Sequence, residues 1–241
     1  LSKKENIDNT FSGKIFLKKS IKLSNIYFSY NESNNWILKN INLEIKKGSK
    51  VGIKGTTGSG KSTLGNIIIG LLDPTKGQLF VDDILINSQN KLAWQKNISI
   101  IPQNIFLNDV SIAENIAIGI EPKEINLEKV KKAARQAQIN DFIESTPNQY
   151  NEKVGERGIK LSGGQQQRIG IARALYREAK VILFDEATNQ LDTNTESLIM
   201  QSINNLGKEI TILFIAHRLS TLENCDHIYK IDKGGLKLAK S

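Results

Sequence analysis

The sequence predicts an α/β fold in which helices cover both faces of a mainly parallel sheet. Three observations support this prediction. Five short segments rich in Ile, Val and Phe are apolar almost throughout, which is typical of strands buried on both faces. Longer stretches between these segments carry apolar residues at helical spacing. Two earlier segments, 21–30 and 36–45, alternate more nearly between apolar and polar residues and predict an antiparallel sheet at the N-terminal side.

Glycine and proline positions divide the chain into the individual elements. The predicted parallel strands are 50–54, 98–101, 181–184, 210–215 and 227–231. The predicted helices are 61–72, closed by a turn at Asp73-Pro74, then 127–137, 162–177 and 193–206. Residues 104–179 carry little strand signal, so we expect a helical lobe inserted between two strands of one core. Residues 1–20 are interpreted as a solvated linker, and residues 21–241 as the folded domain.

Composition limits the function classes without choosing among them. The 241 residues carry a formal net charge of +8, which suits nucleic acid, phosphorylated ligands or an anionic membrane surface. The single cysteine, Cys225, cannot form an intramolecular disulfide, and no Cys/His spacing indicates a zinc site. A reducing compartment is therefore the simplest interpretation. The apolar runs are far shorter than the roughly 18 residues that a membrane-spanning helix needs.

A phosphate-binding pattern, G-x-x-x-x-G-K-[ST], follows the predicted strand 50–54 and precedes the predicted helix from residue 61. It consists of Gly55, Thr56, Thr57, Gly58, Ser59, Gly60, Lys61, Ser62 and Thr63. We expect backbone N–H groups to surround phosphate oxygens, Lys61 to reach the β- and γ-phosphates, and the Ser62 hydroxyl to ligate Mg²⁺. The alternative is a flexible glycine turn, but four fixed positions match by chance in roughly one chain of this length in a hundred.

Two carboxylates end the predicted strand 181–184. Ligands in open α/β sheets lie at the carboxyl ends of strands, so Asp185 is expected to hold Mg²⁺ through its hydration shell and Glu186 to orient or deprotonate an attacking water. Taken alone, an Asp-Glu pair at this position is more often a solvated turn.

A second anion-binding element precedes the predicted helix 162–177. It reads Leu161-Ser162-Gly163-Gly164-Gln165, with bare N–H groups and a hydroxyl available to an anion. A serine N-cap followed by glycines is also an ordinary junction between a loop and a helix. One explanation for two phosphate-contacting elements in one chain is that they serve different nucleotides.

The order and spacing of these three motifs closely resemble the nucleotide-binding domain of the ATP-binding cassette (ABC) transporter family, over residues 21–233. The resemblance implies a P-loop NTPase core of the RecA-like type with an antiparallel β subdomain and a helical subdomain. It also implies an ATPase that uses ATP and Mg²⁺, with Ser162, Gly163, Gly164 and Gln165 contacting a nucleotide held by a second copy.

Four further residues match positions of the family pattern. The resemblance implies that Tyr30 stacks on adenine and that Gln103 contacts Mg²⁺, the attacking water and the transmembrane partner. It implies that His217 contacts the γ-phosphate and that Asp192 belongs to a loop crossing to the opposite subunit. Without the family, Tyr30 and His217 are more simply structural residues, and Asp192 is a helix N-cap. The chain departs from the family at Asn189-Gln190, and the usual C-terminal helix is missing or truncated after residue 235.

The resemblance favours the motor domain of an exporter at the cytoplasmic face of a membrane. Residues 154–158 resemble the exporter segment that contacts the intracellular loops of a transmembrane domain, which is expected upstream in the same polypeptide. Nucleic acid is not expected as a partner. A soluble ATPase acting on nucleic acid or ribosomes and a stand-alone importer subunit are the alternatives. The cargo, whether lipid, glycan, peptide or drug, is left open.

Overall fold

The computed structural model describes residues 15–31, 35–187, 193–216 and 218–240. Its strands form two sheets. The smaller sheet consists of β1 (Ser20–Phe28), β2 (Leu38–Lys46), β4 (Lys76–Val81) and β5 (Ile84–Ile86). These strands pair in the order β2-β1-β4-β5, each antiparallel to its neighbour. The predicted antiparallel sheet at the N-terminal side is therefore confirmed.

The larger sheet carries the parallel strands. It consists of β3 (Lys50–Lys54), β6 (Ile98–Pro102), β7 (Val181–Asp185), β8 (Thr211–Ile215), β9 (His227–Asp232) and β10 (Gly235–Lys240). The order is β10-β9-β3-β8-β7-β6, and only the β10–β9 pair is antiparallel. This order places the carboxyl ends of β3, β6, β7 and β8 along one edge, and it confirms the predicted α/β fold class.

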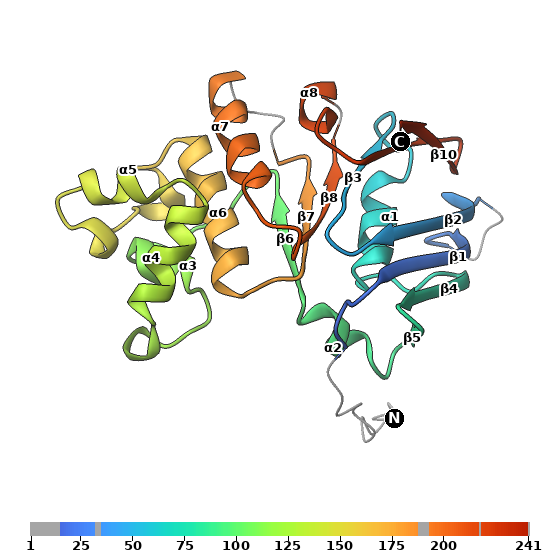
Figure 1. The fold of residues 1–241 in the computed structure, drawn as a ribbon, viewed down its shortest axis with the longest axis horizontal. Coiled ribbons are helices and arrows are strands. Elements are labelled where there is room, and N and C mark those ends of the chain that lie inside the picture. The colour runs from blue at the N-terminus through green and yellow to red at the C-terminus, as the bar shows by residue number, and fades with distance from the viewer. Residues whose placement is uncertain (1–14, 32–34, 188–192, 217, 241) are drawn as a thin grey trace.

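Helices cover both faces of the larger sheet. Those before the lobe are α1 (Lys61–Ile68) and α2 (Lys91–Gln95). Those between β6 and β7 are α3 (Ile112–Ile116), α4 (Leu127–Gln136), α5 (Asn140–Ser145) and α6 (Gly163–Tyr176), and those that follow are α7 (Thr193–Asn204) and α8 (Leu219–Leu222). Figure 1 shows α3 to α6 at one end of the molecule and the smaller sheet at the other. Within the described ranges, no helix combines the length and apolar character of a membrane span.

Strand β7 is apolar from Val181 to Phe184 because it is buried on both faces. Ile182 and Phe184 lie in the core shared with the helical lobe, whereas Val181 and Leu183 lie in the core shared with α1 and the smaller sheet. Successive side chains of a strand point to opposite faces, so a strand covered on both sides has no polar position. Burial of each such side chain contributes about 1.5–3 kcal/mol to folding. The strand end at Asp185 is thereby held firmly at the sheet edge.

The structure differs from the sequence-based prediction in several places, among them the short helices α2, α3, α5 and α8, which were not predicted individually. Helix α1 ends at Ile68 and not at residue 72, because Gly70 adopts a left-handed φ of 73° and the Leu71 N–H donates to the carbonyl of Asn66 at 2.8 Å. Strands β4 and β5 were not predicted, because they are short and depend on distant or neighbouring partners: β4 pairs with β1, and β5 pairs with β4. The chain after residue 234 forms the edge strand β10, which was not among the predicted strands.

Candidate functional site

The phosphate loop joins the buried strand β3 to α1. Gly58 and Gly60 have left-handed φ values of 75° and 100°, which glycine adopts without strain. A Cβ on Gly55 would lie 2.6 Å from the Ser59 hydroxyl and 2.8 Å from the carbonyl oxygen of Ile231. The loop therefore requires glycine at these positions, and it leads directly into the N-terminus of α1, which favours bound anions.

Lys61 lies inside this loop. Its side chain is buried, and Nζ donates to the carbonyl oxygens of Gly55 at 3.1 Å and Thr56 at 3.0 Å. Burial lowers the pKa of Lys61, while the negative charges of Glu186 and Asp185 act in the opposite direction. The loop thus holds an ammonium group among its own carbonyls.

Ser62 and Asp185 meet at the end of β7. The Ser62 hydroxyl donates to Oδ1 of Asp185 at 3.2 Å. Burial raises the pKa of Asp185, and the neighbouring charge of Glu186 adds to this effect, whereas the Ser62 hydrogen bond and Lys61 oppose it. A hydroxyl and a carboxylate are oxygen ligands of the kind that Mg²⁺ prefers. These two residues fit the predicted magnesium site.

Glu186 directly follows Asp185 and lies in a backbone conformation unusual for its type. Its φ is 54°, and its N–H donates to the carbonyl of Ile215 at the end of β8 at 2.9 Å. A left-handed residue other than glycine persists only where the surroundings enforce it, and such residues are frequent at functional sites. The hydrogen bond to β8 fixes the backbone of Glu186 beside Asp185 and within the electrostatic reach of Lys61.

Gln103 directly follows β6. Pro102 pairs with Asp185 in the parallel register between β6 and β7, so Gln103 leaves the sheet at the same edge as Glu186. The structure therefore brings the backbone of Gln103 to the edge that carries Lys61, Ser62 and the two carboxylates.

An open pocket of about 640 Å³ lies beside the phosphate loop. Its lining includes Thr57, Gly58 and Ser59 of the loop, together with Lys39 and Lys233 from two other segments. Lys39 and Lys233, with Asp232 in the same lining, leave a net positive charge beside the predicted phosphate loop, which favours an anionic ligand. The sequence analysis did not single out Lys39 or Lys233, because only the pairing of the sheets brings them to the loop.

The second predicted anion-binding element, at Ser162, starts α6. The Ser162 hydroxyl accepts a hydrogen bond from the Gln165 N–H at 3.3 Å, and the Gln165 side-chain oxygen accepts one from the Ser162 N–H at 2.8 Å. This reciprocal capping fixes the first turn. Ser162 and Gly163 are exposed, whereas Gly164 is buried against Thr195 at the start of α7.

The starts of α6 and α1 belong to different faces of the sheet. Helix α6 packs through Ile169 in the same core as Phe184, whereas α1 packs through Ile67 in the same core as Leu183. Among the described residues, no hydrogen bond joins residues 162–165 to the loop 55–60. The described structure thus brings Lys61, Ser62 and the carboxylates together and leaves the Ser162 element outside this cluster.

Comparison with known proteins gives the family. Residues 38–189 match the model of the family described as ABC transporter, and this stretch contains the phosphate loop, the start of α6 and the end of β7. The chain belongs to the ABC transporter family. Its fold is that of an ABC ATPase domain, as the sequence predicts.

Individual ABC relatives match nearly all of the chain. An ATP-dependent lipid A-core flippase of Pseudoalteromonas translucida is 39% identical over 221 residues, which are 91% of this chain and 38% of that protein. The leukotoxin translocation ATP-binding protein LktB of a Pasteurella haemolytica-like species is 43% identical over 229 residues, covering 93% of this chain and 32% of LktB.

The solved structures give the same family. A bacterial Atm1-family ABC exporter with ATP bound is similar with a TM-score of 0.82 at 36% identity, over 93% of this chain and 39% of that chain. The chain therefore spans about two fifths or less of the length of the relatives described here.

Tyr30, which the ABC resemblance assigns to adenine, lies beside the loop. Its hydroxyl is hydrogen-bonded to the Thr63 hydroxyl at 3.2 Å, and its ring packs edge-on against Phe28 with centroids 4.9 Å apart. Tyr30 is 61% exposed, which leaves ring surface available to a ligand. Its role in stacking on adenine stays a prediction.

Two residues of the predicted ABC site, His217 and Asp192, lie outside the described residues, as do Asn189 and Gln190. The described chain nevertheless shows how the flanking segments are tied together. Glu196 of α7 accepts hydrogen bonds from Arg218 at 2.9 Å, Ser220 at 3.0 Å and Thr221 at 2.7 Å. Sequence analysis missed Glu196, and its only signal was an acid in the first turn of a predicted helix.

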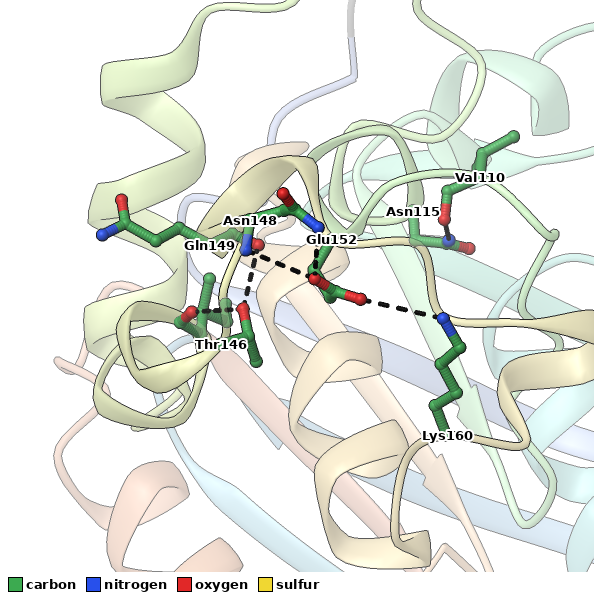
Figure 2. Close-up of polar contacts among 8 residues, drawn as sticks. Val110, Asn115, Thr146, Asn148, Gln149, Glu152 and Lys160 are labelled. Carbon is green, nitrogen blue, oxygen red and sulfur yellow. Dashed lines mark hydrogen bonds and ion pairs between the residues drawn. The ribbon is translucent and has the colours of Figure 1, made fainter.

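The segment 154–158 lies between two residues that contact one another, Glu152 and Lys160 (Figure 2). The Glu152 carboxylate accepts a hydrogen bond from the Asn148 amide at 2.9 Å and lies 3.7 Å from Lys160 Nζ. The Val154 N–H donates to the carbonyl of Val110 at 3.3 Å, and the Lys160 N–H donates to the carbonyl of Val154 at 3.2 Å. These contacts hold the two ends of the segment together, just before Ser162.

Proposed function

We propose that this domain binds and hydrolyses Mg-ATP as the motor of an ABC exporter. The observation that carries the proposal is the convergence of Lys61, Ser62 and Asp185 on one glycine-rich loop. A cation inside an anion-binding loop, next to two oxygen ligands for Mg²⁺, is suited to a nucleoside triphosphate. The names of the two relatives, a flippase and a translocation protein, favour the exporter over a soluble ATPase or an importer subunit.

The role proposed for each residue follows from its charge and from the charge of the reacting phosphate. The transition state of phosphoryl transfer spreads negative charge over the phosphoryl oxygens, and Lys61 and the loop N–H groups stabilise this charge. Ser62, Gln103 and, through the hydration shell, Asp185 would hold Mg²⁺, which would neutralise charge on the phosphates. Glu186 positions or deprotonates the attacking water. The family resemblance adds His217 at the γ-phosphate and Tyr30 at the adenine.

A second copy completes each site in this proposal. Ser162 and Gly163 form the exposed end of a capped helix start. Among the described residues, this helix start makes no hydrogen bond to the phosphate loop of its own chain. A phosphate held by the loop of one copy would complete the anion site of the other, as two head-to-tail subunits allow. Asp192 would contribute to the contact between the copies.

The second proposed partner is a transmembrane domain, upstream in the same polypeptide. The ATPase domain would then lie at the cytoplasmic face of the membrane. A groove of about 380 Å³ between β6 and α6 is lined by Ile100, Phe106 and Arg173 among others. Phe106 is 64% exposed and Ile100 is 43% exposed, so the groove presents apolar surface to solvent. An apolar groove beside Gln103 suits a helix of that domain, and residues 154–158 would add a second contact.

Light scattering of the Glu186→Gln protein with and without Mg-ATP tests the proposal. The variant should bind ATP, turn it over far more slowly and shift from monomer to dimer only when ATP is present. The double variant Lys61→Ala, Glu186→Gln is the control and should stay monomeric, because it lacks the phosphate-binding cation. Turnover near the wild-type rate would remove Glu186 from its role. A monomer that persists with ATP bound would contradict the sandwich formed by two domains.

A further inference from the structure

One polar side chain in the middle of α6 is buried against the segment that contains Gln103. Gln167 is only 4% exposed, and its side-chain amide donates to the carbonyl oxygen of Gln103 at 2.7 Å and to that of Pro102 at 3.2 Å. One amide thus binds two successive carbonyls at the point where the chain leaves β6. A buried amide in this arrangement fixes the backbone that it contacts.

The same face of α6 holds the rest of this segment. One turn after Gln167, a Cβ on Gly170 would lie 2.7 Å from Ile105, so the helix backbone packs closely on that side chain. A further turn on, Arg173 donates to the carbonyl of Phe106 at 2.7 Å and to the carbonyl of Asn115 at 2.6 Å. Residues 102–106 therefore lie against three successive turns of α6.

Arg173 stays positively charged although its side chain is largely buried. Burial lowers the pKa of Arg173 to about 10, which still leaves the guanidinium protonated at neutral pH. Two carbonyls and the side-chain oxygen of Asn115 accept its hydrogen bonds, the last at 3.1 Å. The far end of the 102–106 segment is thereby held as firmly as its start.

We propose that Gln167 is a positioning residue for Gln103. We further propose that α6 links Gln103, which serves the nucleotide of its own chain, to Ser162, which contacts the nucleotide of the second copy. The inference rests on the proposed function, in which Ser162 at the start of α6 caps the ATP of the second copy while Gln103 serves the ATP of its own chain. Ser162 stands at the start of α6, and Gln167, five residues later on the same helix, holds the backbone of Gln103. A displacement of Ser162 or of Gln103 is therefore transmitted to the other through the helix. The two ATP sites of the dimer are therefore coupled through α6.

The neighbouring glutamine supplies a matched control. Gln166 also donates through its side-chain amide to two carbonyls, those of Gly158 at 3.1 Å and Leu161 at 3.3 Å. Its partners lie in the loop before α6 and not in the segment of Gln103. The same substitution at Gln166 and Gln167 therefore separates the loss of a side-chain amide that binds two carbonyls from the loss of contact to Gln103.

The experiment compares Gln167→Met with Gln166→Met in the full-length transporter. Gln167→Met should lower kcat roughly tenfold, as outer-shell contacts of metal sites typically do, and raise the Mg²⁺ concentration needed for half-maximal rate. It should also reduce the cooperativity in ATP while leaving the affinity for a fluorescent ATP analogue close to wild type. Gln166→Met should leave the basal rate and the Mg²⁺ dependence unchanged.

A double-mutant cycle with Gln103→Ala then tests whether Gln167 acts through Gln103. If it does, the loss of rate caused by Gln167→Met should nearly disappear in the Gln103→Ala background. Independent, multiplicative effects would overturn the proposal, and so would equal kinetics of the two methionine variants. If circular dichroism shows that Gln167→Met does not fold, Gln167→Asn replaces it, with the same expected loss of rate and Mg²⁺ affinity. A wild-type protein that neither binds nor hydrolyses ATP would instead refute the proposed function.

Discussion

The hydroxyl of Ser62 and the carboxylate of Asp185 are joined by a hydrogen bond of 3.2 Å although 123 positions separate them in the sequence. Ser62 stands in the first turn of α1 and Asp185 at the carboxyl end of β7, so the parallel sheet brings them to one edge. Burial and the charge of Glu186 raise the pKa of Asp185 at this position.

The first prediction concerns the charge of Asp185. An acid whose pKa is raised on folding contributes most stability below its ordinary pKa, near 4, and loses that contribution as pH rises through the folded value. Asp185→Asn removes the buried charge, so it should raise the Tm at pH 7, by an amount that shrinks as pH falls toward about 4. The same variant should weaken the Mg²⁺ dependence of ATP turnover. Calorimetry at several pH values checks the first effect, and a lower Tm at pH 7 would contradict it.

The second prediction concerns Lys61. Lys61→Ala removes the cation that lies among the loop carbonyls, and a charge-assisted hydrogen bond contributes about 1.5–3 kcal/mol. The affinity for ATP should therefore fall by about 10- to 100-fold in a fluorescence titration. Lys131→Ala is the control, because Lys131 lies in α4 and pairs with Glu128 at 3.1 Å. Unchanged affinity of the Lys61 variant would refute the phosphate assignment.

The third prediction concerns the contact between α6 and α7. A Cβ added at Gly164 would collide with Cγ2 of Thr195. Gly164→Ala should destabilise the domain by about 1–3 kcal/mol, because one helix must shift to make room. Thr195→Ser removes the colliding methyl and keeps the hydroxyl, so the double variant should recover most of that loss in a urea unfolding curve. Equal destabilisation of the single and double variants would mean that the cost has another origin.

The fourth prediction concerns Glu196. Burial acts to raise its pKa, but hydrogen bonds from Thr221, Arg218 and Ser220 outweigh burial and hold the pKa below its ordinary value. An acid with a lowered pKa contributes stability above its ordinary value, near 4.3, and this contribution is lost as pH falls through the folded value. Glu196→Gln should cost about 1–3 kcal/mol at pH 7. The difference from wild type should narrow below about pH 4.3, and a constant difference across this range would contradict the ionic role.

Local patterns in the sequence were enough for the fold class and the family. The phosphate loop, the apolar strand that ends at Asp185 and the serine cap of α6 are each encoded by fewer than ten consecutive residues. Glycine at positions 58 and 60, for example, is demanded by the left-handed backbone of the loop itself. The specific roles assigned to Tyr30, Gln103, His217 and Asp192 stay predictions, and the last two residues lie outside the described ranges.

Other features depend on partners far away in the sequence, so no local pattern could reveal them. Strands β5 and β10 are edge strands that carry exposed or polar side chains and form only beside β4 and β9. Lys39 and Lys233 reach the phosphate loop only through the pairing of the sheets.

The sequence by itself determined that this chain has an ABC ATPase fold, with a glycine-rich loop before α1, acids at a strand end and a serine-capped start of α6. The tertiary structure decided which of these groups meet: Ser62 with Asp185, Gln167 with the carbonyl of Gln103, and Glu196 with Arg218. The physical reason is that local motifs are set by backbone conformation and short-range hydrogen bonds. Contacts between distant segments are set by the order of strands in the sheet and by which helix covers each face.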